Sequence, residues 1–410
     1  RSYPLMERDF QITIWGATGF TGQIVTEYLH KNYGNEIRWA IAGRSIEKLQ
    51  SVKNKLQLND SVECLVGDSF DEISLQAISS RTDVIISTVG PYALYGKAMV
   101  NVCVESKTDY CDLTGEIPFV KNSIDAFHEK AKANEVKIVH SCGYDSIPSD
   151  IGCLLLQEKA VEKYGKPASN VKLFVMGTKG TFSGGTVASM INLMKEAKNP
   201  AKRKIQSDPY ILCNDVIDGM PIQKIQNFTW YDPRIEKWTA PFIMARFNSR
   251  IVFRTNDLSN YQYGRDFVYD EGLAVGYGMK GKFRGAILMV AIGIFIKLMS
   301  MSFTRSLLQK TVLPKPGEGP SRADRESGYF KVKIIGENEE GENRTTVIIS
   351  NTNDPGYGST SIMLAESALC LALDKNDLPH EYGVVTTAMA MGTTIADRLK
   401  KAGFNISVSD

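Results

Sequence analysis

The stretch that most constrains the fold of this chain runs from Ile12 to Gly22 and reads Ile-Thr-Ile-Trp-Gly-Ala-Thr-Gly-Phe-Thr-Gly. Apolar side chains at Phe10, Ile12 and Ile14 predict a buried strand, and the pattern from Gln23 to Tyr33 predicts an amphipathic helix. Three evenly spaced glycines join the two. A strand, a glycine turn and a helix in this order begin a dinucleotide-binding sheet.

Each glycine of the turn has its own role. Gly16 permits the tight turn out of the strand, and Gly22 lets the helix pack closely on it. Gly19 allows a pyrophosphate to approach the amides at the positive end of the helix dipole. The spacing G-x-x-G-x-x-G is a variant common in NADP-dependent reductases, and a purely structural glycine turn is the alternative. The predicted cofactor contacts here are Gly16, Thr18, Gly19, Phe20, Thr21 and Gly22.

The end of the second predicted strand indicates which dinucleotide binds. The apolar run Ile37 to Ala42 is followed by Gly43, Arg44 and Ser45, with Lys48 one turn later. Sites that prefer NAD(H) place a carboxylate here, and that carboxylate would repel a 2′-phosphate. An arginine instead makes charge-assisted hydrogen bonds to phosphate. Arg44, Ser45 and Lys48 therefore predict NADP(H) rather than NAD(H); the alternative is that Arg44 is only a solvated helix-start residue.

Strands alternate with helices up to about residue 150, which predicts a doubly wound parallel sheet of the Rossmann type. A chain of 410 residues has room for more than one domain. We expect a dinucleotide-binding domain over 1–155, a second α/β domain over 156–355, and a C-terminal helical segment over 356–410. Within the second domain, residues 198–245 are expected to form a long loop, and 329–335 and 345–350 a hairpin.

Composition narrows the range of partners. The formal net charge of +2 gives no electrostatic argument for nucleic-acid binding. Seven scattered cysteines without a C-x-x-C pair are typical of a reducing compartment, so we expect an intracellular protein. The four histidines show no metal-ligand spacing, and no metal site is predicted.

In such a sheet, ligands lie beyond the carboxyl ends of the strands, where three loops carry candidate residues. Gly90 and Pro91 follow the fourth strand, and Tyr92 is a candidate to stack on the nicotinamide or donate a proton, or else to fill a domain interface. Asp112 and Asp145 follow the fifth and sixth strands. Either could act as a general acid, and the alternative is that each caps the next turn through backbone hydrogen bonds.

Several segments in the same order resemble the saccharopine dehydrogenase-like oxidoreductase family, including its animal members. The matching segments are GATGFTG at 16–22, AGR at 42–44, VGPY at 89–92, YCDLTGE at 110–116, CGYDSIPSD at 142–150 and GVVTTAMAMG at 383–392. The resemblance implies a Rossmann domain, a second α/β domain and a returning C-terminal helix. It leaves the substrate open, because relatives range from saccharopine reductases to enoyl reductases of lipid biosynthesis.

A hydrophobic segment at 285–303 lies outside this scheme. Its uninterrupted apolar part, Ala286 to Ile296, measures about 17 Å as a helix, against a hydrocarbon core of roughly 30 Å. A buried core helix, an interfacial anchor and a true span are the three alternatives. Basic residues on both sides of the segment favour an interfacial anchor, with Ile292 and Phe295 facing lipid. The resemblance points the same way, because the animal relatives resemble proteins found on lipid droplets and membranes. We therefore expect peripheral association with a membrane or lipid-droplet surface facing the cytosol.

Together these features predict an NADP-dependent oxidoreductase that acts on a small-molecule or lipid-linked substrate. The alternative is a non-catalytic NADP-binding scaffold on a lipid droplet or membrane, because no acid–base pair stands out in the sequence. A homodimer is compatible with either.

Overall fold

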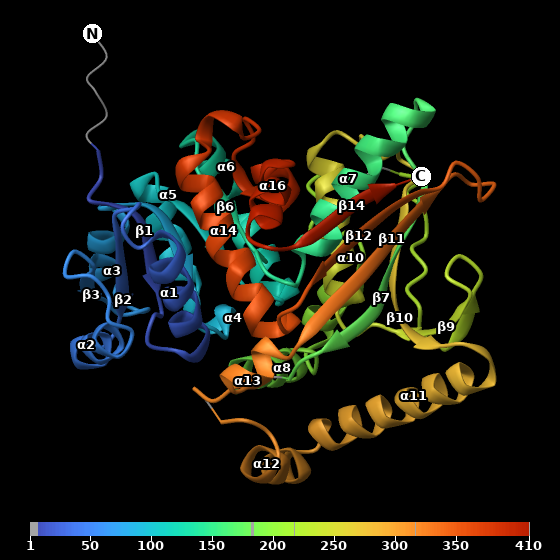
Figure 1. Cartoon of the computed structure of the whole chain (residues 1–410), viewed down its shortest axis with the longest axis horizontal. Coiled ribbons are helices and arrows are strands. Elements are labelled where there is room, and N and C mark those ends of the chain that lie inside the picture. The colour runs from blue at the N-terminus through green and yellow to red at the C-terminus, as the bar shows by residue number, and fades with distance from the viewer. Residues whose placement is uncertain (1–6, 182–183, 217, 316, 410) are drawn as a thin grey trace. The chain divides into compact units, whose positions relative to one another are not determined.

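The computed structural model describes residues 7–181, 184–216, 218–315 and 317–409 (Figure 1). The chain forms two compact units, and each is described by itself. The first comprises Arg1–Thr114, Phe119–Gly143 and Thr360–Arg398, and the second comprises Gly115–Pro118, Tyr144–Ser359 and Leu399–Asp410.

The first unit is built on a seven-stranded parallel sheet in the order β13-β6-β5-β4-β1-β2-β3. This order, with the chain crossing over between β1 and β4, is that of the predicted Rossmann sheet. Its strands are β1 (Phe10–Trp15), β2 (Trp39–Gly43), β3 (Glu63–Val66), β4 (Thr82–Ser87), β5 (Asp109–Asp112), β6 (Lys137–Val139) and β13 (Gly383–Val385).

The central strands are apolar along most of their length because parallel strands are covered on both faces. Ile14 pairs with Ile41 on one side and with Ile86 on the other, and all three side chains are fully buried. The helices between the strands are α1 (Phe20–Tyr33), α2 (Ile46–Lys55), α3 (Glu72–Ser79), α4 (Tyr92–Tyr95), α5 (Lys97–Ser106) and α6 (Ile117–Ala133).

The C-terminal part of the chain returns to this unit, as the family resemblance implied. Helix α14 (Thr360–Leu373) packs beside α1 and over β1, β4 and β5. Its buried Glu366 accepts hydrogen bonds of 2.7 Å from the hydroxyls of Tyr28 and Tyr33 on α1. The chain then passes through η2 (Lys375–Asp377), β13 and α15 (Thr387–Met391), and β13 extends the sheet beside β6.

The second unit contains a mixed seven-stranded sheet in the order β14-β12-β11-β7-β10-β9-β8. Among the described residues of this unit, only β7 and β10 pair in parallel, and the predicted hairpin is present as β11 and β12. The strands are β7 (Asn170–Lys179), β8 (Trp230–Asp232), β9 (Lys237–Pro241), β10 (Val268–Gly276), β11 (Tyr329–Glu337), β12 (Thr345–Asn351) and β14 (Asn405–Ser409). The helices are α7 (Ile147–Tyr164), α8 (Gly184–Glu196), α9 (Pro200–Ser207), α10 (Ala245–Leu258), α11 (Gly278–Ser300), α12 (Ser302–Thr311), α13 (Arg322–Glu326), η1 (Pro355–Ser359) and α16 (Thr394–Lys401), whose last residues belong to this unit.

Two expectations differ from this arrangement. The division between the units falls near residue 143 rather than 155, because α7 packs on β11 and β12, where a Cβ on Gly152 would meet Ile334 at 2.1 Å. The predicted long loop 198–245 contains α9, β8 and β9. These elements are short, and β9 is placed by its pairing with β10, which is distant in sequence, while β8 pairs with β9.

The hydrophobic segment belongs to α11, which is longer than the apolar run suggested. The helix has 23 residues and is about 35 Å long, so it meets the length and composition of a membrane-crossing helix. Only 11% of its most apolar window is buried, which contradicts the core-helix alternative.

Candidate dinucleotide site

The glycine turn between β1 and α1 has the geometry that its sequence predicted. Gly16 has a φ of +91°, and a Cβ there would lie 2.7 Å from Thr88 Oγ1. A Cβ on Gly22 would lie 2.0 Å from the carbonyl oxygen of Gly16, so only glycine lets α1 start this close to the turn. Gly19 is exposed at the N-cap of α1, where no side chain caps the helix. The amides of that first turn, from Phe20 to Gly22, point out of the helix end, toward the space that a pyrophosphate needs.

Thr88 is a residue of this site that the sequence analysis missed. It follows β4, and its hydroxyl donates to the carbonyl oxygens of Trp15 at 3.2 Å and Gly16 at 3.1 Å. These bonds hold the loop after β4 against the glycine turn. No sequence signal marks a lone threonine for this role, because the contact depends on β4 crossing over to lie beside β1.

Arg44 lies at the carboxyl end of β2, next to the glycine turn. The amides of Gly16 and Ala17 donate to the carbonyl oxygen of Ala42, two residues before Arg44, at 3.0 and 3.2 Å. Arg44 and Lys48 are exposed. Ser45 caps α2: its hydroxyl accepts from the amide of Lys48 at 3.3 Å and donates to Glu47 at 2.7 Å. The cationic side chains of Arg44 and Lys48 therefore lie near the end of β1, and Ser45, between them in sequence, caps the start of α2. Thr18 lies close by, its methyl group 3.7 Å from where a Cβ on Gly43 would be.

The loop after β4 contains Gly90 and Pro91, and Pro91 is the N-cap of α4. Gly90 is exposed and Tyr92 is 6% exposed. The Tyr92 hydroxyl donates to the carbonyl oxygen of Ser87 at 3.0 Å and accepts from the amide of Leu113 at 3.3 Å, and its ring packs against Phe119. Tyr92 thus joins the ends of β4 and β5, which favours a structural role over proton donation.

Asp112 is the centre of a buried polar network at the end of β5. Its carboxylate accepts from the amides of Thr114 and Ser141 at 3.0 Å and from the Tyr110 hydroxyl at 2.9 Å. His140 Nδ1 lies 2.7 Å from the same carboxylate, and its Nε2 lies 2.8 Å from Ser123 Oγ. The bond to Thr114, two residues on, is the capping alternative that the sequence left open.

The order Ser123–His140–Asp112 has the connectivity of a nucleophilic triad, which the sequence analysis did not detect. All three side chains are at most 3% exposed, and Ser123 lies inside α6 rather than on a strand-to-helix turn. A substrate carbonyl cannot reach this serine in the folded unit. We interpret the three residues as a hydrogen-bonded core network that fixes the ends of β5 and β6.

Asp145 belongs to the second unit, in the loop that leads into α7. Burial raises its pKa to about 7, so this carboxyl exchanges a proton near neutral pH. The residues around it are structural. Ser146 Oγ donates to Asn248 at 2.8 Å, and Asp150, in the first turn of α7, accepts from the Thr255 hydroxyl at 2.5 Å.

A second buried carboxylate, Glu271 on β10, was also missed. It accepts hydrogen bonds from Ser149 Oγ at 2.5 Å, the Tyr269 hydroxyl at 2.8 Å and Asn248 Nδ2 at 3.0 Å. Desolvation nevertheless raises its pKa to about 7. The sequence gives no signal for it, because an acid in an apolar strand acquires meaning only when its partners from α7 and α10 are known.

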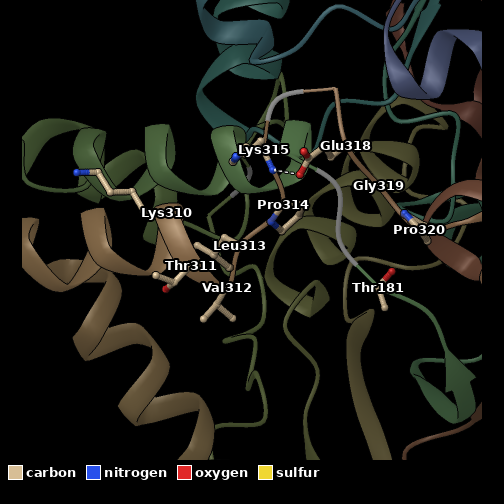
Figure 2. A pocket seen from close by; sticks show the side chains of 10 residues that line it. All are labelled: Thr181, Lys310, Thr311, Val312, Leu313, Pro314, Lys315, Glu318, Gly319 and Pro320. Atoms are coloured by element: carbon tan, nitrogen blue, oxygen red, sulfur yellow. Dashed lines mark hydrogen bonds between the residues drawn. The ribbon is translucent and has the colours of Figure 1, made fainter.

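A hollow of about 380 Å³ lies elsewhere on the second unit. Figure 2 shows that its lining comes from Thr181, from the end of α12 and from the connector that follows α12, where the amide of Lys315 donates to Glu318 at 3.0 Å. The ten lining residues in the described parts of the chain are distinct from the predicted site residues. Over the same described ranges, no group of three His, Cys, Asp or Glu side chains is placed to hold a metal ion.

The chain is similar in sequence to known NADP-binding proteins. The family model of the saccharopine dehydrogenase NADP-binding domain matches residues 12–139, a range that contains the glycine turn, Arg44 and Thr88. The putative trans-acting enoyl reductase of Mycobacterium tuberculosis (strain H37Rv) is 37% identical over 417 residues, covering 98% of each chain. The trans-acting enoyl reductase of Mycobacterium ulcerans is 34% identical over 415 residues, again covering 98% of each chain.

Among solved structures, apo saccharopine dehydrogenase (L-Glu forming) from Saccharomyces cerevisiae superposes with a TM-score of 0.51 and covers 98% of this chain and 99% of its own. At 13% identity this likeness concerns the fold alone. Sequence, sheet order and NADP-binding domain agree: the chain belongs to the saccharopine dehydrogenase-like oxidoreductase family.

Proposed function

We propose that this protein is an NADPH-dependent reductase that saturates the conjugated carbon–carbon double bond of an enoyl thioester carrying a lipid-like chain. In this reaction a hydride adds to the β-carbon and a proton to the α-carbon. The observation that supports this choice is the 37% identity to a putative trans-acting enoyl reductase over 98% of both chains. The likeness to saccharopine dehydrogenase extends only to the fold, so it does not favour an amino-acid substrate.

The residues of the first unit fit NADP(H). Gly19 leaves the N-terminus of α1 open to a pyrophosphate, and the Gly16 turn is held in place by Thr88. Arg44, with Lys48 one turn later, offers positive charge to a 2′-phosphate. The described residues directly after β2 are Arg44 and Ser45, so no carboxylate stands there to repel that phosphate. Bound there, NADPH would supply the hydride.

Of the three candidate acids, Asp145 is the one we propose for proton delivery. Its pKa of about 7 lets it hold a proton at neutral pH and release it to a carbanion-like centre. Tyr92 and Asp112 are instead engaged with backbone groups of the first unit. Removing the Asp145 carboxyl should therefore lower kcat with little change in NADPH affinity.

The test is a turnover assay with NADPH and a series of trans-2-enoyl thioesters on coenzyme A or pantetheine, with chain lengths from short to long. We expect NADPH consumption and formation of the saturated thioester, a KM that falls as the chain lengthens, and a large drop in kcat for Asp145→Asn. Asp270→Asn is the matched control, because burial raises the pKa of Asp270 to about 6 outside the proposed site. Equal losses in both variants would remove Asp145 from the mechanism.

The second candidate function is a non-catalytic NADP-binding scaffold, which is favoured by the structural engagement of Tyr92 and Asp112. Tight NADPH binding measured by calorimetry, with no saturated product from any thioester in the series, would select the scaffold over the reductase.

A further inference from the structure

Helix α11 presents a continuous apolar row to solvent. Met279, Phe283, Ile287, Val290 and Ile294 recur every three or four residues, so they share one face of the helix. Their exposures lie between 55% and 67%. The row continues onto α12 through Met301, Phe303 and Leu307, which are exposed by 50–79%. Contiguous apolar surface of this size on a folded protein marks an interaction site.

The opposite side of α11 is fixed to the second unit at both ends. Near its start, a Cβ on Gly285 would lie 2.4 Å from Thr229 Cγ2, so the helix backbone packs directly on the segment before β8. Near its end, Met299 is fully buried against Ile191 of α8, and Phe295 packs against the same cluster. Figure 1 shows α11 running along the second unit between β9 and α12.

Because α11 is attached in this way, it can lie in a membrane surface but cannot cross the membrane. A spanning helix is surrounded by lipid and places its two ends on opposite sides of a core roughly 30 Å thick. Both ends of α11 pack on one folded unit, so the helix can enter lipid only side-on, through the row described above. Ile292 and Phe295, expected from the sequence to face lipid, lie instead on the half-buried side.

The charge around α11 indicates which kind of partner surface can bind to this face. Between Gly272 and Gly317 the chain has no acidic residue and seven basic ones: Lys280, Lys282, Arg284, Lys297, Arg305, Lys310 and Lys315. A second copy of the chain docked on the same face would bring two such sets of cations together, which opposes association. Anionic phospholipid headgroups complement them and lie directly beside the apolar layer that the row needs.

We propose that α11 and α12 form a membrane-binding face that inserts side-on into a bilayer surface rich in anionic phospholipid. The apolar row enters the acyl layer, and the basic residues pair with headgroups. This proposal does not depend on the proposed reaction, since it concerns only the second unit.

The experiment measures co-sedimentation of the full-length protein with vesicles of phosphatidylcholine, with or without phosphatidylserine. We expect the protein to bind only the vesicles that contain phosphatidylserine, and we expect this binding to weaken as the salt concentration is raised. Ile287→Asp should lower the binding constant about tenfold or more, because an isoleucine leaves the acyl layer and a charge replaces it. Lys280→Gln combined with Arg284→Gln should lower it about 25-fold, at about fivefold per basic residue.

Ile222→Asp is the matched control, because Ile222 is 86% exposed in the same unit but is not part of α11. It should bind like the parent, and all variants should keep the parental melting temperature, since every substituted side chain is exposed. Several results would overturn the proposal: no binding of the parent to either vesicle, equal binding to both, unchanged binding of Ile287→Asp, or a dimer that Ile287→Asp dissociates.

Discussion

At the scale of single residues, substitutions at two glycines of the turn should have different effects, one on stability and the other on NADPH binding. Gly22→Ala would place a Cβ 2.0 Å from a backbone oxygen, which cannot move without shifting β1, so we expect a loss of roughly 1–3 kcal/mol or more of unfolding free energy. Gly19→Ala would place its Cβ 3.4 Å from the same oxygen, a tolerable contact, but toward the exposed helix end. It should keep the parental stability and weaken NADPH binding. Urea unfolding and calorimetry measure the two effects, and a Gly19→Ala protein that binds NADPH normally would show that the pyrophosphate does not approach there.

We expect Arg44 to determine whether NADPH or NADH binds more tightly. Arg44→Asp should weaken NADPH binding by about tenfold to a hundredfold, because a charge-assisted hydrogen bond contributes about 1.5–3 kcal/mol, while NADH affinity stays the same or rises. Arg38→Asp is the control, since Arg38 is also exposed and lies just before the opposite end of β2. Equal losses for NADPH and NADH in Arg44→Asp would mean that this residue does not contact a 2′-phosphate.

At the scale of elements, Glu366 connects the returning helix α14 to the first helix of the chain. It is 1% exposed, accepts hydrogen bonds from Tyr28 and Tyr33, and lies 3.3 Å from Arg398 Nε. Glu366→Ala should cost about 3 kcal/mol, because it leaves a half-buried guanidinium and two hydroxyls without this partner. Glu27→Ala removes an exposed ion pair with Lys31 on the same α1 and should cost less than about 1 kcal/mol. Equal unfolding midpoints for the two variants would show that α14 does not stabilise α1.

At the scale of the whole molecule, buried carboxyls make stability depend on pH in an unusual direction. Burial raises the pKa of Glu271 to about 7, from about 4.3 in an unfolded chain. The folded state therefore holds this proton more tightly, so the contribution to stability is complete below about pH 4 and is lost as the pH rises through about 7. Glu271→Gln should reduce the slope of unfolding free energy against pH between about 4 and 7 without abolishing it, because Asp145 and Asp270 also have raised pKa values, whereas Glu340→Gln, at an exposed site, should leave the slope unchanged. A parental slope that persists in Glu271→Gln would assign the effect to other groups.

The residues alone predicted the first half of the Rossmann unit, its glycine turn and the charge at the end of β2. These features are local: a strand, a turn and a helix within a few residues, with a period that the residues themselves display. The hairpin of β11 and β12 and the return of α14 were predictable as well, the first from its alternation and the second from the family resemblance.

Other features depend on contacts between residues that are distant in sequence. Thr88, Ser123 and Glu271 have roles because strands distant in sequence become neighbours, and a single sequence carries no signal for such pairs. The same holds for α11, whose residues are apolar nearly all round. Its composition could not tell a buried side from an exposed one, and the packing of Gly285 and Met299 settled which row faces solvent.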